Sequence, residues 1–105
     1  MQQLVIMENI DRDNVIRILG SNKDGLIQNY GLLKLGVFGS VARNEAGEGS
    51  DIDIVVETKV PDLLRMVNLK EDLEELLHSK VDLVRYRFRM NALLKKRIDK
   101  EAHYV

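Results

Sequence analysis

Two aspartates one residue apart, Asp51 and Asp53, border and interrupt the apolar run Ile52 to Val56. This alternation predicts a β-strand on which both carboxylates point to one face and the isoleucines point to the core. Neighbouring carboxylates repel each other, and their desolvation costs free energy unless a cation neutralises them. The pair therefore predicts a divalent metal site. For such a pair alone, an exposed edge strand with alternating acids is the simpler interpretation.

A third carboxylate, Asp82, lies in the apolar segment Val81 to Val84, which predicts another strand. An ion pair with Lys80 or Arg85 is the ordinary alternative. Together, the three aspartates are the groups that a metal-assisted phosphoryl or nucleotidyl transfer requires. Oxygen ligands favour Mg²⁺, and two such ions activate an attacking oxygen and stabilise a leaving pyrophosphate. Asp82 is the candidate to accept the proton of the attacking hydroxyl.

A glycine and a serine, Gly39 and Ser40, follow the segment Leu32 to Phe38, which predicts a buried strand. Glycine permits close approach of the backbone to a ligand, and Ser40 is expected to cap a short helix at about Val41 to Ala46. Free N–H groups and the positive end of a helix dipole favour a phosphate there. A Gly-Ser dipeptide alone is usually only a turn, so this interpretation depends on the aspartates that follow.

The elements that must position these residues follow from hydrophobic periodicity and capping signals. One long helix is expected from Asp11 to Tyr30, because its apolar stripe keeps its phase across Gly20, and Gly31 is expected to end it. Helices alternate with strands along the whole chain, which predicts an α/β fold with a small sheet of three or four strands. The strands are expected at Leu32–Phe38, Asp51–Glu57 and Lys80–Arg85, the last ending at Arg85 or at Phe88, and the later helices at Asp62–His78 and Asn91–Lys100.

Composition limits the class of protein. At 105 residues, 45% apolar and 31% charged, the chain is expected to form one soluble domain over residues 1–105. A formal charge of −1 provides no global basic field, so direct binding of nucleic acid is not expected. The absence of cysteine fits a reducing cytoplasm. Without a signal peptide or an apolar run near the ~20 residues of a membrane helix, we expect a cytoplasmic protein without membrane association.

Residues 85–100 depart from this even charge balance. They contain seven lysines and arginines and a single acid, Asp99. The segment is either a docking surface for an acidic partner or RNA, or a solvated helix face that follows a strand end rich in arginine.

Taken together, these motifs resemble a known family. Phe38-Gly39-Ser40-Val41-Ala42-Arg43 with Ser50-Asp51-Ile52-Asp53-Ile54-Val55-Val56 is similar to the signature of the DNA polymerase β-like nucleotidyltransferase superfamily. More narrowly, it looks like the minimal nucleotidyltransferases of prokaryotes. The resemblance covers nearly the whole chain, because Leu69 to Leu77 and Val81 to Val84 also match the pattern. It implies the nucleotidyltransferase fold, a mixed sheet flanked by helices.

The resemblance also implies roles for individual residues. Asp51 and Asp53 would hold two Mg²⁺ ions, and Asp82 would complete the metal and catalytic site. The cofactor-binding residues would be Gly39 and Ser40, which would grip the triphosphate of a nucleotide, usually ATP. In addition, Arg43 matches a motif position at which it would face a phosphate or brace the loop, with a plain surface arginine as the alternative.

The implied activity is transfer of AMP to a protein. Many minimal members are antitoxins, encoded beside a toxin of the HEPN nuclease class, and are thought to silence it by adenylylating a toxin tyrosine. Larger members of the superfamily hold the acceptor on further domains, for which 105 residues leave no room, so a partner protein is the economical acceptor. A non-catalytic antitoxin that neutralises its partner by contact, and nucleotidyl transfer to a small molecule, both stay open. Homo- and hetero-oligomers are equally compatible with the sequence.

Overall fold

The computed structural model describes residues 10–47 and 49–105. Helices and strands alternate along this part of the chain, as expected for an α/β fold. The helices are α1 (Arg12–Ser21), α2 (Lys23–Tyr30), α3 (Gly39–Ala42), α4 (Leu63–Leu77) and α5 (Ala92–Glu101), and the strands are β1 (Leu32–Phe38), β2 (Ile52–Thr58), β3 (Val81–Arg85) and β4 (His103–Tyr104).

The four strands form one mixed sheet in the order β3-β2-β1-β4. Strand β1 runs antiparallel to both β2 and β4, whereas β2 and β3 are parallel. The parallel pair is joined through α4, which is the usual connection between parallel strands. The prediction of a small mixed sheet flanked by helices is therefore confirmed.

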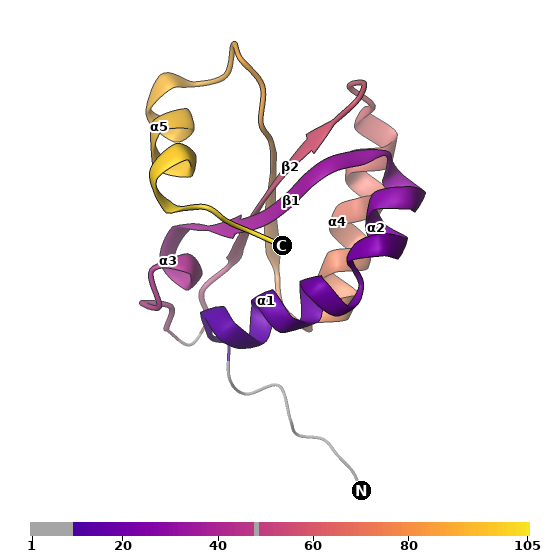
Figure 1. Cartoon of the computed structure of the whole chain (residues 1–105). Helices are drawn as coiled ribbons and strands as arrows, with labels where there is room; N and C mark the ends of the chain where they lie inside the picture. Colours follow the sequence, from indigo (N-terminus) through magenta and orange to yellow (C-terminus); the bar gives the residue numbers. More distant parts are fainter. Residues whose placement is uncertain (1–9, 48) are drawn as a thin grey trace, which may run out of the picture.

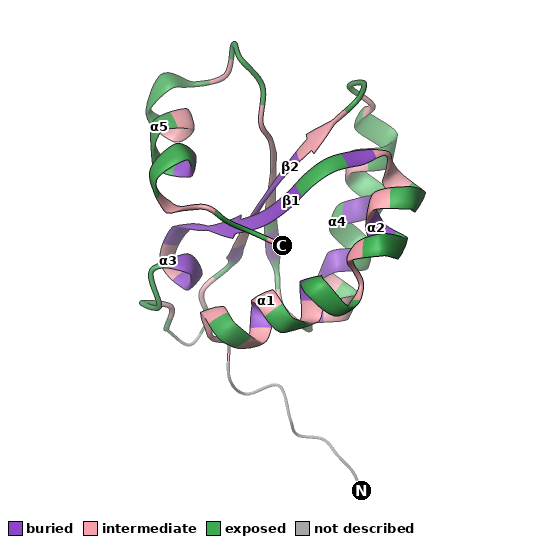
Figure 2. Cartoon of the chain, in the orientation of Figure 1, coloured by how far each residue is buried: buried purple, intermediate pink, exposed green. Residues whose placement is uncertain are grey.

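Each face of the sheet has its own apolar cluster. In Figure 1, α1, α2 and α4 lie on one side of β1 and β2, and α5 lies on the other. The larger cluster includes Val37 and Ile54 of the sheet, and the smaller one joins Phe38, Val55 and the fully buried Ile98 of α5. Burying such a side chain contributes roughly 1.5–3 kcal/mol, so Ile98 is a main anchor of α5. Figure 2 shows the buried residues along the central strands and on the inward faces of the helices.

The expectation of one long first helix is wrong. Helix α1 ends at Ser21 and α2 begins at Lys23, with Asn22 between them. The Asn22 backbone N–H and side-chain amide both donate to the Ile18 carbonyl, at 3.2 and 2.8 Å, so the side chain caps the end of α1 in addition to the last helical hydrogen bond. Gly31 does end α2, in the left-handed conformation with φ of 64°, as predicted.

The third helix also differs from its prediction. It begins at Gly39 rather than Val41 and ends at Ala42 rather than Ala46. Ser40 therefore lies inside its first turn and is not a cap, and Phe38 holds the cap position without a side-chain hydrogen bond. Strand β1 has the predicted bounds, β2 begins one residue later than expected, and β3 ends at Arg85.

Strand β4 at the end of the chain was not expected. It pairs with β1 through Gly36↔Tyr104 and Val37↔His103. Helix α4 is close to its prediction, with Asp62 as its N-cap and His78 as its C-cap. In the described part of the chain, no helix has both the length and the apolar character needed to cross a membrane.

Candidate active site

The two central aspartates face each other across parallel strands. Asp53 of β2 is in register with Asp82 of β3. Side chains alternate along a strand, so both aspartates share the sheet face of Val55 and Val84, which pack in the cluster beneath α5. The structure thus brings together two of the three carboxylates that the sequence singled out, at the end of the smaller core.

Asp51 lies just outside β2 and is exposed. It lines an open hollow of about 450 Å³ together with Ser50 and Lys80. Within residues 10–47 and 49–105, no three acidic, histidine or cysteine side chains are grouped closely enough to form a metal site by themselves. Asp51 is still near enough for its charge to act on Asp53.

The turn after β1 is in direct contact with the aspartate on β2. Phe38 is the register partner of Asp53, so Gly39 begins α3 immediately beside that carboxylate. A Cβ atom built on Gly39 would overlap the Asp53 carboxylate and lie 2.9 Å from its Cγ. Gly39 also has φ of 75°, a conformation that side chains with a Cβ rarely adopt. Glycine is therefore required here both for space and for backbone conformation.

The electrostatics of Asp53 are those of a crowded carboxylate. Partial burial raises the pKa of its carboxyl group above the usual value, and the neighbouring charge of Asp82 raises it further. Asp51 adds to the rise, whereas the cations Arg97 and Arg43 oppose it. The ionised form of Asp53 is thus disfavoured unless positive charge is brought close.

The oxygen donors of Asp53 and Asp82 are of the kind that a magnesium ion takes. In the described chain, neither the Asp53 nor the Asp82 carboxylate takes part in a hydrogen bond or an ion pair, so both keep their oxygens available. Mg²⁺ typically takes one or two protein carboxylates and completes its shell with water and substrate phosphates. Two carboxylates in register beside a glycine turn satisfy this requirement without a third protein ligand.

Arg43 is held by acidic residues of its own chain. Its guanidinium donates to Glu45 at 3.1 Å and to Glu101, the last residue of α5, at 2.9 Å. These ion pairs tie the end of α3 to the end of α5.

Sequence reasoning did not single out Arg97. Its guanidinium carbon lies 5.9 Å from the centre of the Phe38 ring, and its charge acts on Asp53. The only available signal was the excess of basic residues between 85 and 100. Within the described residues, none of the seven basic side chains of this segment forms an ion pair. They are Arg85, Arg87, Arg89, Lys95, Lys96, Arg97 and Lys100.

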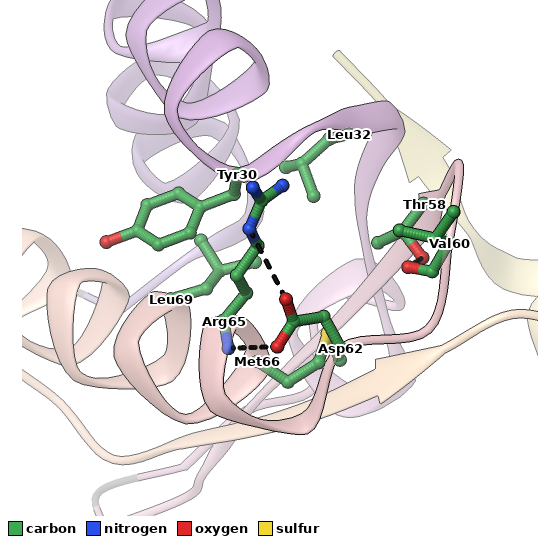
Figure 3. Close-up of a pocket in the computed structure, with 8 residues that line it drawn as sticks. All are labelled: Tyr30, Leu32, Thr58, Val60, Asp62, Arg65, Met66 and Leu69. Atoms are coloured by element: carbon green, nitrogen blue, oxygen red, sulfur yellow. Dashed lines mark hydrogen bonds and ion pairs between the residues drawn. The ribbon is translucent and has the colours of Figure 1, made fainter.

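A second cavity lies away from the aspartates. It is lined by residues of α2, α4 and the strand ends between them, including Tyr30, Asp62 and Arg65, as Figure 3 shows. Its volume of about 10 Å³ is only enough for about one water molecule, so it is not a ligand site. Asp62 accepts from the Arg65 backbone N–H at 3.1 Å and pairs with its guanidinium, which is a helix-capping arrangement.

Several known proteins are similar to this chain. The protein adenylyltransferase MntA of Thermococcus cleftensis is 42% identical over 79 residues, which cover 74% of this chain and 80% of that protein. A relative from Methanocaldococcus jannaschii, named in the same enzyme class, is 43% identical over 89 residues, or 84% of this chain and 91% of that protein.

Solved structures agree with the sequence relatives. A minimal nucleotidyltransferase superposes with a TM-score of 0.74 at 34% identity, covering 91% of this chain and 97% of that one. A toxin–antitoxin structure with AMP-PNP contains a chain that superposes with a TM-score of 0.68 at 25% identity, covering 80% of this chain and 69% of that one.

The family model described as "Polymerase beta, Nucleotidyltransferase" matches residues 21–105, a range that contains Gly39 and all three aspartates. The chain belongs to this nucleotidyltransferase family and is an enzyme of that class.

Proposed function

We propose that this protein transfers AMP from ATP, with Mg²⁺, to a tyrosine of a partner protein, and that it is the antitoxin of a toxin–antitoxin pair. The observation that carries the proposal is the register of Asp53 with Asp82 beside Gly39. The similar protein adenylyltransferase of T. cleftensis and the similar chain in a toxin–antitoxin structure with AMP-PNP support it. The HEPN class of the toxin and the tyrosine acceptor are inferred from the resemblance to the minimal nucleotidyltransferases.

The chain's own residues have distinct tasks in this reaction. Asp53 and Asp82 would hold Mg²⁺, with Asp51 at the rim as a further ligand. When bound, Mg²⁺ neutralises phosphate charge and polarises the phosphorus that is attacked. Gly39 leaves the space in which the carboxylate of Asp53 lies against the turn, and with Ser40 it would contact the triphosphate.

The transfer itself exchanges one P–O bond for another. The tyrosine oxygen forms a bond to the α-phosphorus, and the bond from that phosphorus to the leaving pyrophosphate breaks. The phenolic proton needs an acceptor within hydrogen-bond reach. Asp82 is the proposed acceptor, because its side chain is exposed and carries no partner in the described chain.

The test uses the full chain with its cognate toxin, Mg²⁺ and ATP. Intact-mass spectrometry should find the toxin heavier by one or more adenylyl groups, with the modification on tyrosine. Asp53→Asn should lose the modification but still bind the toxin. Glu57→Gln is a matched control, because Glu57 lies on the same strand and face but is ion-paired with Lys34, and it should modify the toxin normally.

Other outcomes distinguish the alternatives. If Asp53→Asn still neutralises the toxin and no adduct forms with the unaltered chain, the protein is a binding module and the proposal is wrong. Consumption of ATP with a soluble acceptor and no protein partner would instead indicate transfer to a small molecule. We propose the cytoplasm as the location, because the reaction consumes ATP.

A further inference from the structure

We infer that Arg97 of α5 is a phosphate-binding residue of the active site, and that its guanidinium contacts the part of the triphosphate that leaves as pyrophosphate. The inference rests on the proposed function, since it names a further residue for the same nucleotide. It assigns to α5 a direct part in the chemistry, beyond covering one face of the sheet.

The position of Arg97 joins the two halves of the site. Its guanidinium carbon is 5.9 Å from the centre of the Phe38 ring. Phe38 immediately precedes Gly39 and is the register partner of Asp53. Arg97 therefore lies over Phe38, which is next to Gly39 in the chain and next to Asp53 in the sheet. It also lies on the sheet face that carries Asp53 and Asp82.

The backbone beneath Arg97 is held by core packing. Its neighbour Ile98 is fully buried and packs with Phe38 and Val55. Because the helix is anchored at the next residue, the backbone at Arg97 cannot move away from the site without exposing Ile98. The Arg97 side chain itself lines an open hollow of about 390 Å³, together with Lys96, Lys100, Leu93 and Glu101.

Arg97 has no acidic partner in the described chain, whereas Arg43 has two. The Arg43 guanidinium is paired through Nε with Glu45 and through Nη1 with Glu101. In the described chain, Arg97 makes no hydrogen bond or ion pair, and its guanidinium lies over the Phe38 ring. Of the two cations whose charges act on Asp53, only Arg97 can give both edges of its guanidinium to phosphate oxygens.

A bound nucleotide would give this cation a partner. Its triphosphate would bring several negative charges beside three aspartates, and Mg²⁺ neutralises only part of them. A guanidinium beside the carboxylates would take the charge that develops on the leaving pyrophosphate. This places Arg97 among the groups that distinguish a triphosphate from a monophosphate.

The experiment compares Arg97→Ala, Arg97→Lys and Lys96→Ala in the full chain with Mg²⁺. Binding of ATP and of AMP is measured by calorimetry, and transfer to the toxin by intact mass. Arg97→Ala should weaken ATP binding about ten- to a hundredfold and leave AMP binding within about twofold, because a lost charge-assisted hydrogen bond is of that size. Arg97→Lys should recover part of the loss, and Lys96→Ala, on the same helix and hollow, should bind ATP like the unaltered chain.

The results separate this inference from the proposed function. If the unaltered chain binds ATP but never modifies the toxin, the proposed function fails while the ATP comparison still tests Arg97. Equal ATP affinity of Arg97→Ala and the unaltered chain, with matching thermal unfolding, would overturn the inference. So would an Arg97→Ala variant whose only defect is in toxin binding, since Arg97 would then belong to a docking surface.

Discussion

The backbone of Gly39 lies against the carboxylate of Asp53, so the turn after β1 and the aspartate on β2 are in contact without an intervening side chain. This contact depends on the absence of a Cβ atom and on a φ of 75°. Two parts of the motif that are separated along the chain by α3 and the segment after it thus meet at one point.

Gly39→Ala should therefore abolish adenylylation and destabilise the fold. The positive φ alone costs roughly 1–3 kcal/mol for a residue with a Cβ, and the added methyl group must displace Asp53. Activity is measured by toxin adenylylation and stability by urea unfolding. Gly25→Ala is the control, because a Cβ at this position of α2 meets nothing within 4 Å, and it should stabilise the protein by about 0.5–1 kcal/mol. An active Gly39→Ala variant of normal stability would contradict the contact.

Asp53→Asn should raise the thermal stability of the Mg²⁺-free protein at neutral pH. The pKa of Asp53 is raised, so the folded state binds the proton more tightly than the unfolded chain. Stability of the unaltered protein is then lost as the pH rises from the usual value of 3.8 through the folded pKa. Asparagine removes this loss, so the difference in Tm between the two proteins should be largest at neutral pH and shrink towards pH 3.8. A difference that is independent of pH would show that ionisation of Asp53 is not the cause.

The ion pair between Arg43 and Glu101 should be a measurable link between α3 and α5. Glu101 is the less exposed partner, with 16% of its side chain accessible compared with 38% for Arg43. Pairs near a surface contribute about 0.2–1 kcal/mol, so a double-mutant cycle with Arg43→Gln and Glu101→Gln should give a coupling energy in that range by urea unfolding. Strictly additive effects of the two substitutions would mean that the pair does not join the helices in solution.

The last strand should depend on Gly36. A Cβ at this position would lie 2.8 Å from a ring carbon of Tyr104 and 2.9 Å from the His103 carbonyl oxygen. Gly36→Ala should therefore displace β4 from β1, with faster amide hydrogen exchange at residues 103–105 and a lower Tm. The exchange rates of α4, which packs on the sheet face opposite to α5 and away from β4, should change much less. Unchanged protection of the final residues would argue against the β1–β4 pairing.

Local patterns in the sequence were enough to predict most of the elements and the identity of the central aspartates. Strand β1 and helix α4 have nearly the predicted bounds, because alternation, helical period and capping residues act over only a few positions. The break at Asn22 is also local. The sequence prediction missed it because it gave more weight to the continuous apolar stripe than to the capping amide of Asn22. The motif predicted that Gly39 and Asp53 belong to one site, and the contact between them agrees with that prediction.

Only the tertiary structure decided which groups surround those residues. Strand β4 has no pattern of its own, since it consists of two exposed residues that become a strand by pairing with β1. The motif drew attention to Arg43, but folding brings Glu101 to it from 58 positions away and leaves Arg97 over Phe38. Charge and hydrogen bonding act through space, so the partners of an arginine cannot be derived from its neighbours in the chain. The sequence alone singled out the three aspartates, whereas strand pairing decided that Asp53 and Asp82 are in register with Asp51 outside β2, and the packing of α5 decided that Arg97 lies near them.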